Sequence, residues 1–419
     1  MRRAWHLVAR HRGYRLLLTA GLISLAGDWV LSVGLTYLVY RLTGSTLASG
    51  IMLLAWWLPQ ILLGSLAGVL ADRWDRRLTM VFADLLLAAG LFPLLLVHGP
   101  GQVWVVYLVA FWEGAVEQFF TPAQAASVPH LVDADELTAA NGVYGQAQSV
   151  ARLAGSAIGG VIAAYGGLTA VALSDAATFV VSAMLLARVR GYGTATRTAG
   201  ETGGRRQAQA EWTAGIRKCV RDPILRLMIA FIAVTSVGEG ISLALLAPFV
   251  SRVLHGDASA YGTILALQAV GGIAGGVLIA SYGHRLPVRA LVGAGSVLFG
   301  ALDLMLFLYP LALPGLWPAG LLIALAGLPG AALVAGYTTA LQVQAGNDHR
   351  GRVFGAFATV QAAAILLGIA AGGTLGSAIG IVPVLAAQGV AYCGAGLYLT
   401  AALHDRHEPG PCPQPAASP

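Results

Sequence analysis

The chain alternates between long apolar stretches and short polar ones over nearly its whole length. Each apolar stretch runs for roughly 20 residues, the length that an α-helix needs to cross the hydrocarbon core of a bilayer. The stretches show no strict alternation of polar and apolar positions, so they predict spanning helices and not the strands of a barrel. Twelve such helices are expected, at residues 15–40, 46–71, 78–97, 103–122, 142–163, 168–187, 224–250, 260–281, 289–309, 316–341, 353–378 and 382–403.

One polar segment interrupts this pattern near the middle of the chain. Residues 188–222 are rich in Gly, Thr and Arg, and they separate two sets of six predicted helices. We therefore expect an N-terminal half over 1–187, a cytoplasmic linker over 188–222, a C-terminal half over 223–404 and a disordered tail over 405–419. Within the linker, apolar residues of 212–220 recur at helical spacing, which predicts a short helix on the membrane surface.

The composition agrees with a membrane protein and argues against soluble classes. Charged residues make up 11% of the chain, whereas soluble domains contain about 25%. The formal net charge is +6, but the basic residues gather in loops on one side of the predicted bundle, and no nucleic-acid-binding motif is present. Positively charged loops stay in the cytoplasm, so both termini are expected on the cytoplasmic side. The expected location of the protein is the cytoplasmic (inner) membrane of a bacterium. The spans contain no zinc motif and no histidine or cysteine constellation, so neither an enzyme nor a metal site is expected.

The two predicted halves resemble each other in sequence. Asp28 in the first helix matches Glu239 in the seventh, and a glycine precedes each acid. Arg41 and Arg252 follow these acids at the same distance. Parallel repeats of this kind are typical of transporters whose substrate site lies between the halves, near the middle of the bilayer.

The loop after the second predicted helix carries a recognisable motif. It reads GVLADRWDRR, from Gly68 to Arg77, and resembles the signature loop of major facilitator superfamily transporters. The segments GDW, PAQAASVP and RGRVF are similar to those of the drug-exporter branch, which includes macrolide-efflux and siderophore-export proteins. The resemblance covers both halves. It implies an all-α membrane fold of twelve transmembrane helices in two pseudo-symmetric six-helix bundles.

The same resemblance implies a conformational latch at the cytoplasmic surface. Asp72 ends the second helix, and a carboxylate there gains energy against a helix N-terminus and the arginines of the other half. In the family, this loop holds the cytoplasmic side closed in one state and releases it in another. The expected latch residues are Gly68, Asp72, Arg73, Arg76, Arg77, Arg350 and Arg352.

Several acids lie within predicted spans that line the central cavity in the family. A charge at the centre of a spanning helix costs about 2.5–3.5 kcal/mol on insertion scales, so each is a candidate functional group. Burial favours the protonated form of a carboxyl group, as proton-coupled exchange requires. The candidates are Asp28, Glu113, Glu117 and Glu239, together with Arg152. We expect Arg152, deep in the fifth helix, to form an ion pair with Glu113 or Glu117. If the partner is Glu117, this ion pair would be the whole role of Glu117.

Other residues of the spans are expected to support this site. Asp175 and Asp303 lie in helices that form scaffold in the family, so structural pairing is their expected role. Asp84 is expected to join the basic cluster of the loop after the second helix. Trp29 and Trp112 are candidate cavity aromatics, which can stack on an apolar or cationic ligand.

These residues and the resemblance together predict a secondary active transporter that works by alternating access. The expected activity is proton-coupled efflux of an amphipathic small molecule: a drug, a macrolide-like compound or a siderophore. The expected partners are this substrate, protons and the lipid bilayer, with no nucleic acid and no cofactor besides the proton gradient, and the chain is expected to act as a monomer. Two alternatives stay open: an uptake symporter for a nutrient or lipid, and a non-transporting membrane sensor or scaffold.

Overall fold

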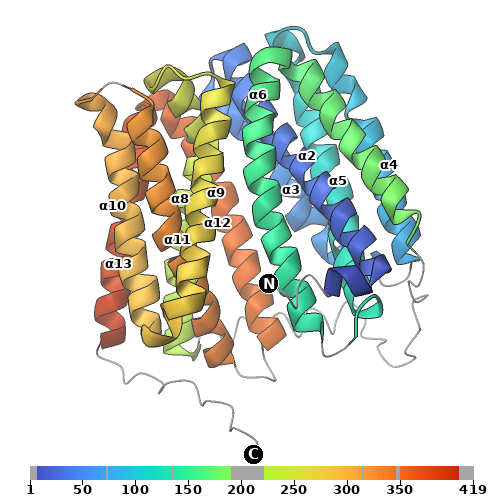
Figure 1. Cartoon of the computed structure of the whole chain (residues 1–419). Helices are drawn as coiled ribbons and strands as arrows, with labels where there is room; N and C mark the ends of the chain where they lie inside the picture. Colours follow the sequence, from blue (N-terminus) through green and yellow to red (C-terminus); the bar gives the residue numbers. More distant parts are fainter. Residues whose placement is uncertain are drawn as a thin grey trace, which may run out of the picture.

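A computed structural model of the chain is built from helices, as the apolar pattern predicts (Figure 1). It describes residues 7–71, 74–133, 136–189, 221–313, 315–345 and 350–404, and no strand occurs in these ranges. The long helices are α2 (Arg12–Thr43), α3 (Thr46–Ala71), α4 (Arg76–Gly90), α5 (Val103–Ser127), α6 (Leu137–Leu186), α8 (Pro223–Pro248), α9 (Ala258–Tyr282), α10 (Gly295–Leu308), α11 (Trp317–Ala345), α12 (Arg350–Ala378) and α13 (Ile381–His404).

Eleven stretches of the described chain are long and apolar enough to cross a membrane, and α6 accounts for two crossings. Its 50 residues are interrupted at Gly167, whose φ of 62° and ψ of −159° are not helical. Glycine adopts a positive φ at little cost, so the chain can reverse here, between the two predicted spans (Figure 1). The protein is therefore a multi-pass membrane protein, and its described part crosses twelve times, as the apolar runs predict.

Three acids outside the spans begin helices. Asp75 accepts a hydrogen bond from the backbone of α4, Asp222 accepts two from α8, and Asp257 accepts one from α9. A carboxylate at this position satisfies amide groups that have no partner within the helix. These acids are therefore explained by local structure, and they leave the intramembrane acids as the ones that need another explanation.

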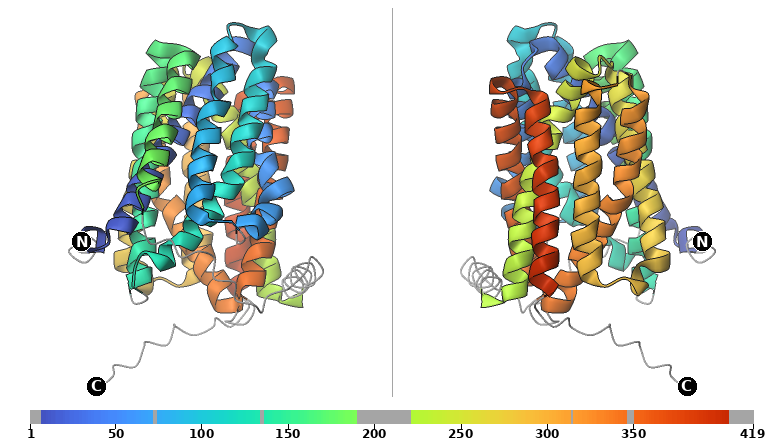
Figure 2. Two further views of the ribbon diagram at one scale, coloured as in Figure 1. Left: turned by 90° about the vertical axis from the view of Figure 1, so that its right-hand side faces the viewer. Right: turned by 90° about the vertical axis from the view of Figure 1, so that its left-hand side faces the viewer.

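The helices form two bundles that lie side by side (Figure 1). Helices α2 to α6 form one bundle and α8 to α13 the other, and each of the two side views has one bundle in front (Figure 2). The bundles meet mainly where α6 packs against α9 and where α3 packs against α12. This is the two-bundle, all-α architecture that the sequence predicts.

The bundles bind each other near the end where α2 leads into α3. Tyr37 Oη donates a hydrogen bond to the carbonyl oxygen of Gly256 at 3.1 Å, and Thr46 Oγ1 donates one to that of Gly373 at 2.9 Å. Gly160 packs so closely against α9 that a Cβ atom there would collide with its backbone. Small residues let spanning helices approach closely in lipid. This end of the molecule is therefore closed by contacts between the bundles.

At the opposite end, where α2 begins, the arginines of the signature loop that the structure describes do not bind the other bundle. Arg76 donates to the carbonyl oxygen of Ala126 at 2.9 Å, and Arg77 donates to that of Ala187, so both arginines bind their own bundle. The latch stays a prediction. Several predicted features lie outside the description: Asp72, Arg73, the surroundings of Gly68, the side chains of Arg350 and Arg352, the predicted surface helix and the C-terminal tail.

Candidate functional site

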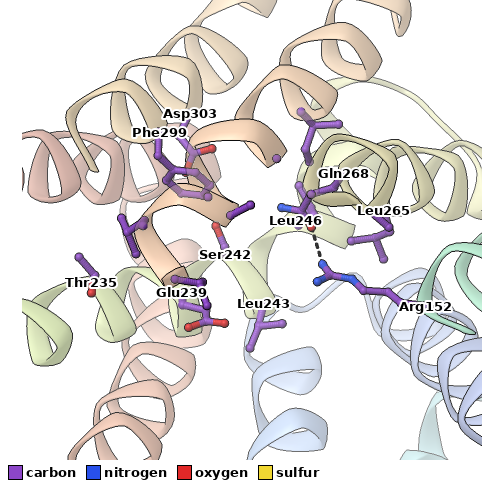
Figure 3. Close-up of a pocket in the computed structure, with 18 of the residues that line it drawn as sticks. Arg152, Thr235, Glu239, Ser242, Leu243, Leu246, Leu265, Gln268, Phe299 and Asp303 are labelled. Atoms are coloured by element: carbon purple, nitrogen blue, oxygen red, sulfur yellow. Dashed lines mark hydrogen bonds between the residues drawn. The ribbon is translucent and has the colours of Figure 1, made fainter. Parts of the chain in front are cut away.

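A cavity of about 690 Å³ lies between the bundles (Figure 3). The C-terminal bundle forms most of its wall, and α2, α3 and α6 contribute the other side. Most of the lining is apolar or aromatic. The charged residues that line it are Arg152, Glu239 and Asp303, and the aromatic ones are Trp29, Tyr261, Phe299, Phe307, Tyr337 and Tyr392.

Glu239 contributes a carboxylate to this cavity. It lies in the middle of α8, and Thr235 and Ser242 of the same helix also line the wall. Its side chain is exposed, and no described residue forms a hydrogen bond or an ion pair with it. The structure therefore places this predicted residue at the cavity, where its oxygens can accept a proton or a cationic ligand.

Arg152 lines the same cavity from α6. Its guanidinium donates to Gln268 Oε1 of α9 at 2.6 Å and lies over the ring of Trp29, with 5.0 Å from Cζ to the ring centroid. No ion pair within 4.0 Å joins Arg152 to Glu113 or Glu117, so the predicted pairing is wrong. The physical reason is direction: Arg152 points toward the second bundle, whereas Glu113 is buried inside the first. The arginine instead bridges the two bundles.

Asp303 is held by a short chain of hydrogen bonds. Gln388 Nε2 donates to Asp303 Oδ2 at 2.9 Å, and Gln388 Oε1 accepts from Ser242 Oγ at 2.7 Å. Asp303 is 6% exposed, and the structural pairing predicted for it is confirmed. These hydrogen bonds link α8, α10 and α13, so they also fix α8, the helix that carries Glu239.

A second group of acids lies inside the N-terminal bundle and does not line this cavity. One oxygen from each of Asp28, Glu113 and Asp175 lies within 4.8 Å of the others. Glu113 and Asp175 are 3% and 0% exposed, whereas Asp28 is half-buried. The glycine at position 27 lets α6 approach α2, since a Cβ atom on Gly27 would collide with Asp175 Oδ1 and Thr178 Oγ1. We call Asp28, Glu113 and Asp175 the acidic cluster.

Two further acids lie near the acidic cluster. Asp84 of α4 is fully buried, and neither of its carboxylate oxygens has a hydrogen-bond partner among the described residues. The prediction that it joins the basic cluster is wrong, because Arg76 and Arg77 bind backbone carbonyl groups at helix ends. Glu117 lies one helical turn farther along α5 and is half-buried. Both acids interact electrostatically with Asp28.

The structure separates the two predicted cavity tryptophans. Trp29 lines the cavity, but Trp112 lies between α4 and α5, where its indole donates to the carbonyl oxygen of Leu86 at 3.0 Å. Uncharged polar residues of the cavity were not found from the sequence. The one feature of the sequence that could have indicated them is an amide or hydroxyl group in the middle of an apolar span, where a polar group needs a partner. These residues include Gln268, Gln388 and Ser242.

Two curated relatives share sequence with the chain. The multidrug efflux pump Tap of Mycolicibacterium fortuitum is 27% identical over 380 residues, which are 87% of this chain and 90% of that protein. Macrolide efflux protein A of Streptococcus pyogenes is 30% identical over 170 residues, which are 40% of this chain and 42% of that protein. The chain is thus similar to efflux proteins, in one case over nearly its whole length.

Solved structures share the fold. A bacterial homologue of the human lysosomal transporter Spinster, in an inward-facing and unoccupied conformation, matches with a TM-score of 0.71 at 16% identity, over 96% of this chain and 99% of that one. Residues 7–408 match the family described as transmembrane secretion effector. The protein therefore belongs to this family of the major facilitator superfamily, and it is a membrane transporter and not an enzyme.

Proposed function

We propose that the protein exports amphipathic small molecules, such as drugs or macrolide-like compounds, in exchange for protons. The observation that carries this proposal is the free carboxylate of Glu239 in an apolar cavity between the two bundles. One carboxylate holds either a proton or a cationic group of the substrate, and this competition couples the two movements. The similarity to efflux proteins supports export over uptake.

The lining of the cavity suits such a substrate. Its volume of about 690 Å³ lies within the range of about 300–1,000 Å³ that is usual for drug-sized ligands. Aromatic rings such as those of Phe299 and Tyr337 contribute apolar contact, and they attract a cation by about 0.5–2 kcal/mol. Glu239 then supplies the charge that distinguishes a cationic amphipath from a neutral one.

The positions of the basic residues orient the protein in this proposal. Positively charged loops place the end where α2 begins in the cytoplasm of a bacterium, together with both termini. The hydrogen bonds from Tyr37 and Thr46 lie at the opposite end, which is then the external one. In this proposed orientation, the contacts between the bundles close the external end, and the substrate enters the cavity from the cytoplasm.

Everted membrane vesicles from cells that produce the protein test this function. With respiration supplying the proton gradient, we expect the vesicles to accumulate ethidium and erythromycin, and a protonophore to abolish this. The Glu239→Gln variant keeps the shape of the side chain but removes its charge, so accumulation is expected to fall at least about tenfold. Asp133→Asn is the control, because Asp133 forms an exposed ion pair with Arg10 at 3.5 Å and does not line the cavity.

Accumulation that persists with the protonophore, or that survives Glu239→Gln, would contradict the proposal. Vesicles of the native orientation distinguish export from the uptake alternative, because a symporter that works inward accumulates its substrate in these vesicles and not in the everted ones. If the protein moves no compound in vesicles of either orientation, the result would favour the third alternative, a membrane sensor or scaffold that does not transport.

A further inference from the structure

The acidic cluster of the N-terminal bundle has no part in the function proposed above. Asp28, Glu113 and Asp175 come from three different stretches, α2, α5 and the second half of α6. Within the described ranges, no ion pair compensates their charge, and the guanidinium of Arg152 binds Gln268 instead. Uncompensated carboxylates in a bundle interior cost several kcal/mol each. These carboxyl groups are therefore either protonated or compensated by a bound cation.

Two oxygens of the cluster also lack hydrogen-bond partners. Glu113 Oε1 and Asp175 Oδ2 have no partner among the described residues, although both side chains are more than nine-tenths buried. Thr178 Oγ1 donates to Asp175 Oδ1 at 3.0 Å, which fixes this carboxylate and leaves its other oxygen free. Native structures contain few buried polar atoms without a partner, and a bound ion can satisfy such atoms.

We propose that Asp28, Glu113 and Asp175 bind a divalent cation of the calcium type. Ca²⁺ lies about 2.3–2.6 Å from its oxygen ligands, so oxygens on opposite sides of one ion are about 5 Å apart. The three oxygens of the cluster lie within 4.8 Å of one another, which is compatible with one shared ion. The donor set is entirely oxygen, which suits calcium, magnesium or manganese and disfavours metals that prefer nitrogen or sulfur.

The surroundings favour such an ion in two ways. Asp84 is fully buried and interacts electrostatically with Asp175, so in its ionised form it adds negative charge that a divalent cation compensates better than a monovalent one. Asp28 is half-buried, which leaves one side of the cluster reachable. An ion held by α2, α5 and α6 would bind these helices together and stabilise the N-terminal bundle.

The test uses the purified full-length protein in detergent after treatment with EDTA. We expect Ca²⁺ to raise the midpoint of thermal unfolding and to bind saturably with one ion per chain in calorimetry, with Mg²⁺, Mn²⁺ and Na⁺ as comparisons. The double variant Glu113→Gln, Asp175→Asn is expected to lose the shift and to bind Ca²⁺ at least about a hundredfold more weakly, because two charged ligands are gone. Glu239→Gln, whose carboxylate lies at the cavity, keeps both responses.

A spectroscopic measurement covers the case in which the double variant does not fold. Tb³⁺ replaces Ca²⁺ at oxygen sites and emits when a nearby tryptophan is excited, and Trp29 adjoins Asp28 in the chain. We expect sensitised emission that Ca²⁺ displaces and that Trp29→Phe reduces.

Three results would overturn the assignment. They are a lack of saturable Ca²⁺ binding, responses that persist in the double variant, and a protein whose stability responds to acid but to none of the cations. The last result means that protons neutralise the cluster. None of these readouts requires transport, so the assignment stands or falls separately from proton-coupled export.

Discussion

The two bundles hold their intramembrane acids in opposite ways. In the C-terminal bundle, Glu239 is exposed to the cavity and Asp303 is hydrogen-bonded to Gln388. In the N-terminal bundle, Glu113 and Asp175 are buried, and each has an oxygen without a partner. The repeated halves have therefore diverged: one presents acid to a cavity, and the other encloses it.

The difference arises from rotation about the helix axis. Asp28 and Glu239 occupy matching positions of the two repeats, yet only Glu239 lines the cavity. On α2, the neighbouring residue Trp29 takes that place. Successive residues of a helix point about 100° apart, so a small change in rotation decides whether an acid meets the substrate or the bundle interior. Equivalent depth in the membrane does not imply equivalent function.

The largest effect is expected from reversing the charge at the cavity. In Glu239→Lys, a positive charge replaces the carboxylate in the cavity that Arg152 also lines, and it repels a cationic substrate. Two like charges a few ångströms apart interact by a few kcal/mol at an effective dielectric constant near 20, so efflux of ethidium is expected to fall by about a hundredfold or more. Initial rates in everted vesicles measure this.

The matching change in the acidic cluster sharpens the comparison. Glu113→Gln removes a carboxylate that does not line the cavity, so its effect on the same rates is expected to be much smaller than that of Glu239→Lys. Equal losses from the two variants would show that the cluster and the cavity act as one site, and the contrast between the bundles would be lost.

A smaller effect is expected from adding one methyl group beside the cluster. In Gly27→Ala, the new Cβ atom collides with Asp175 Oδ1 and Thr178 Oγ1, and overpacking of this kind costs about 1–3 kcal/mol. Gly276→Ala is the matched control on α9, because no atom lies within 4 Å of its added Cβ. Thermal unfolding in detergent compares the two. A Gly27→Ala variant as stable as the control would mean that the packing of α2 against α6 is loose.

The sequence predicts the fold of this protein better than its site. Span lengths follow directly from the apolar runs, and even the reversal at Gly167 lies between two predicted spans. The directions of side chains do not follow, because a helix that is apolar on all sides does not show which face meets a neighbour. This is why Arg152 and Asp84 have other neighbours than predicted and Trp112 packs against α4, whereas Glu239 lines the cavity between the bundles.

The contact of Arg152 with both bundles offers a fourth and weaker test. Arg152→Lys keeps the charge at the cavity but loses the planar group that lies over Trp29 and binds Gln268. The loss of the stacking contact is expected to cost about 0.5–1 kcal/mol, so apparent ethidium affinity should fall only a few-fold. Concentration dependence of the vesicle rates gives this value. A loss as large as that from Glu239→Lys would make Arg152 a direct partner of the carboxylate.

The smallest effect is expected at the closed end, from a single hydroxyl group. Thr46→Val removes the hydrogen bond to the carbonyl oxygen of Gly373, which is worth about 0.5–1.5 kcal/mol, and so favours opening of this end by a few-fold. Thr374→Val is the control, since Thr374 Oγ1 donates only within its own helix, to the carbonyl oxygens of Ala370 and Ala371.

Spin labels report the opening. They are attached at Gly101→Cys and Leu311→Cys, which lie near this end in separate bundles, in a chain whose three native cysteines are replaced by serine. Thr46→Val is expected to increase the population of longer label distances, and Thr374→Val is not. If both variants shift the distances equally, the hydroxyl group acts through its own helix and not through contact between the bundles. Such a result would leave the hydrogen bond from Tyr37 to Gly256 and the glycine packing of Gly160 against α9 as the interactions that close this end, because Thr46→Val removes neither of them.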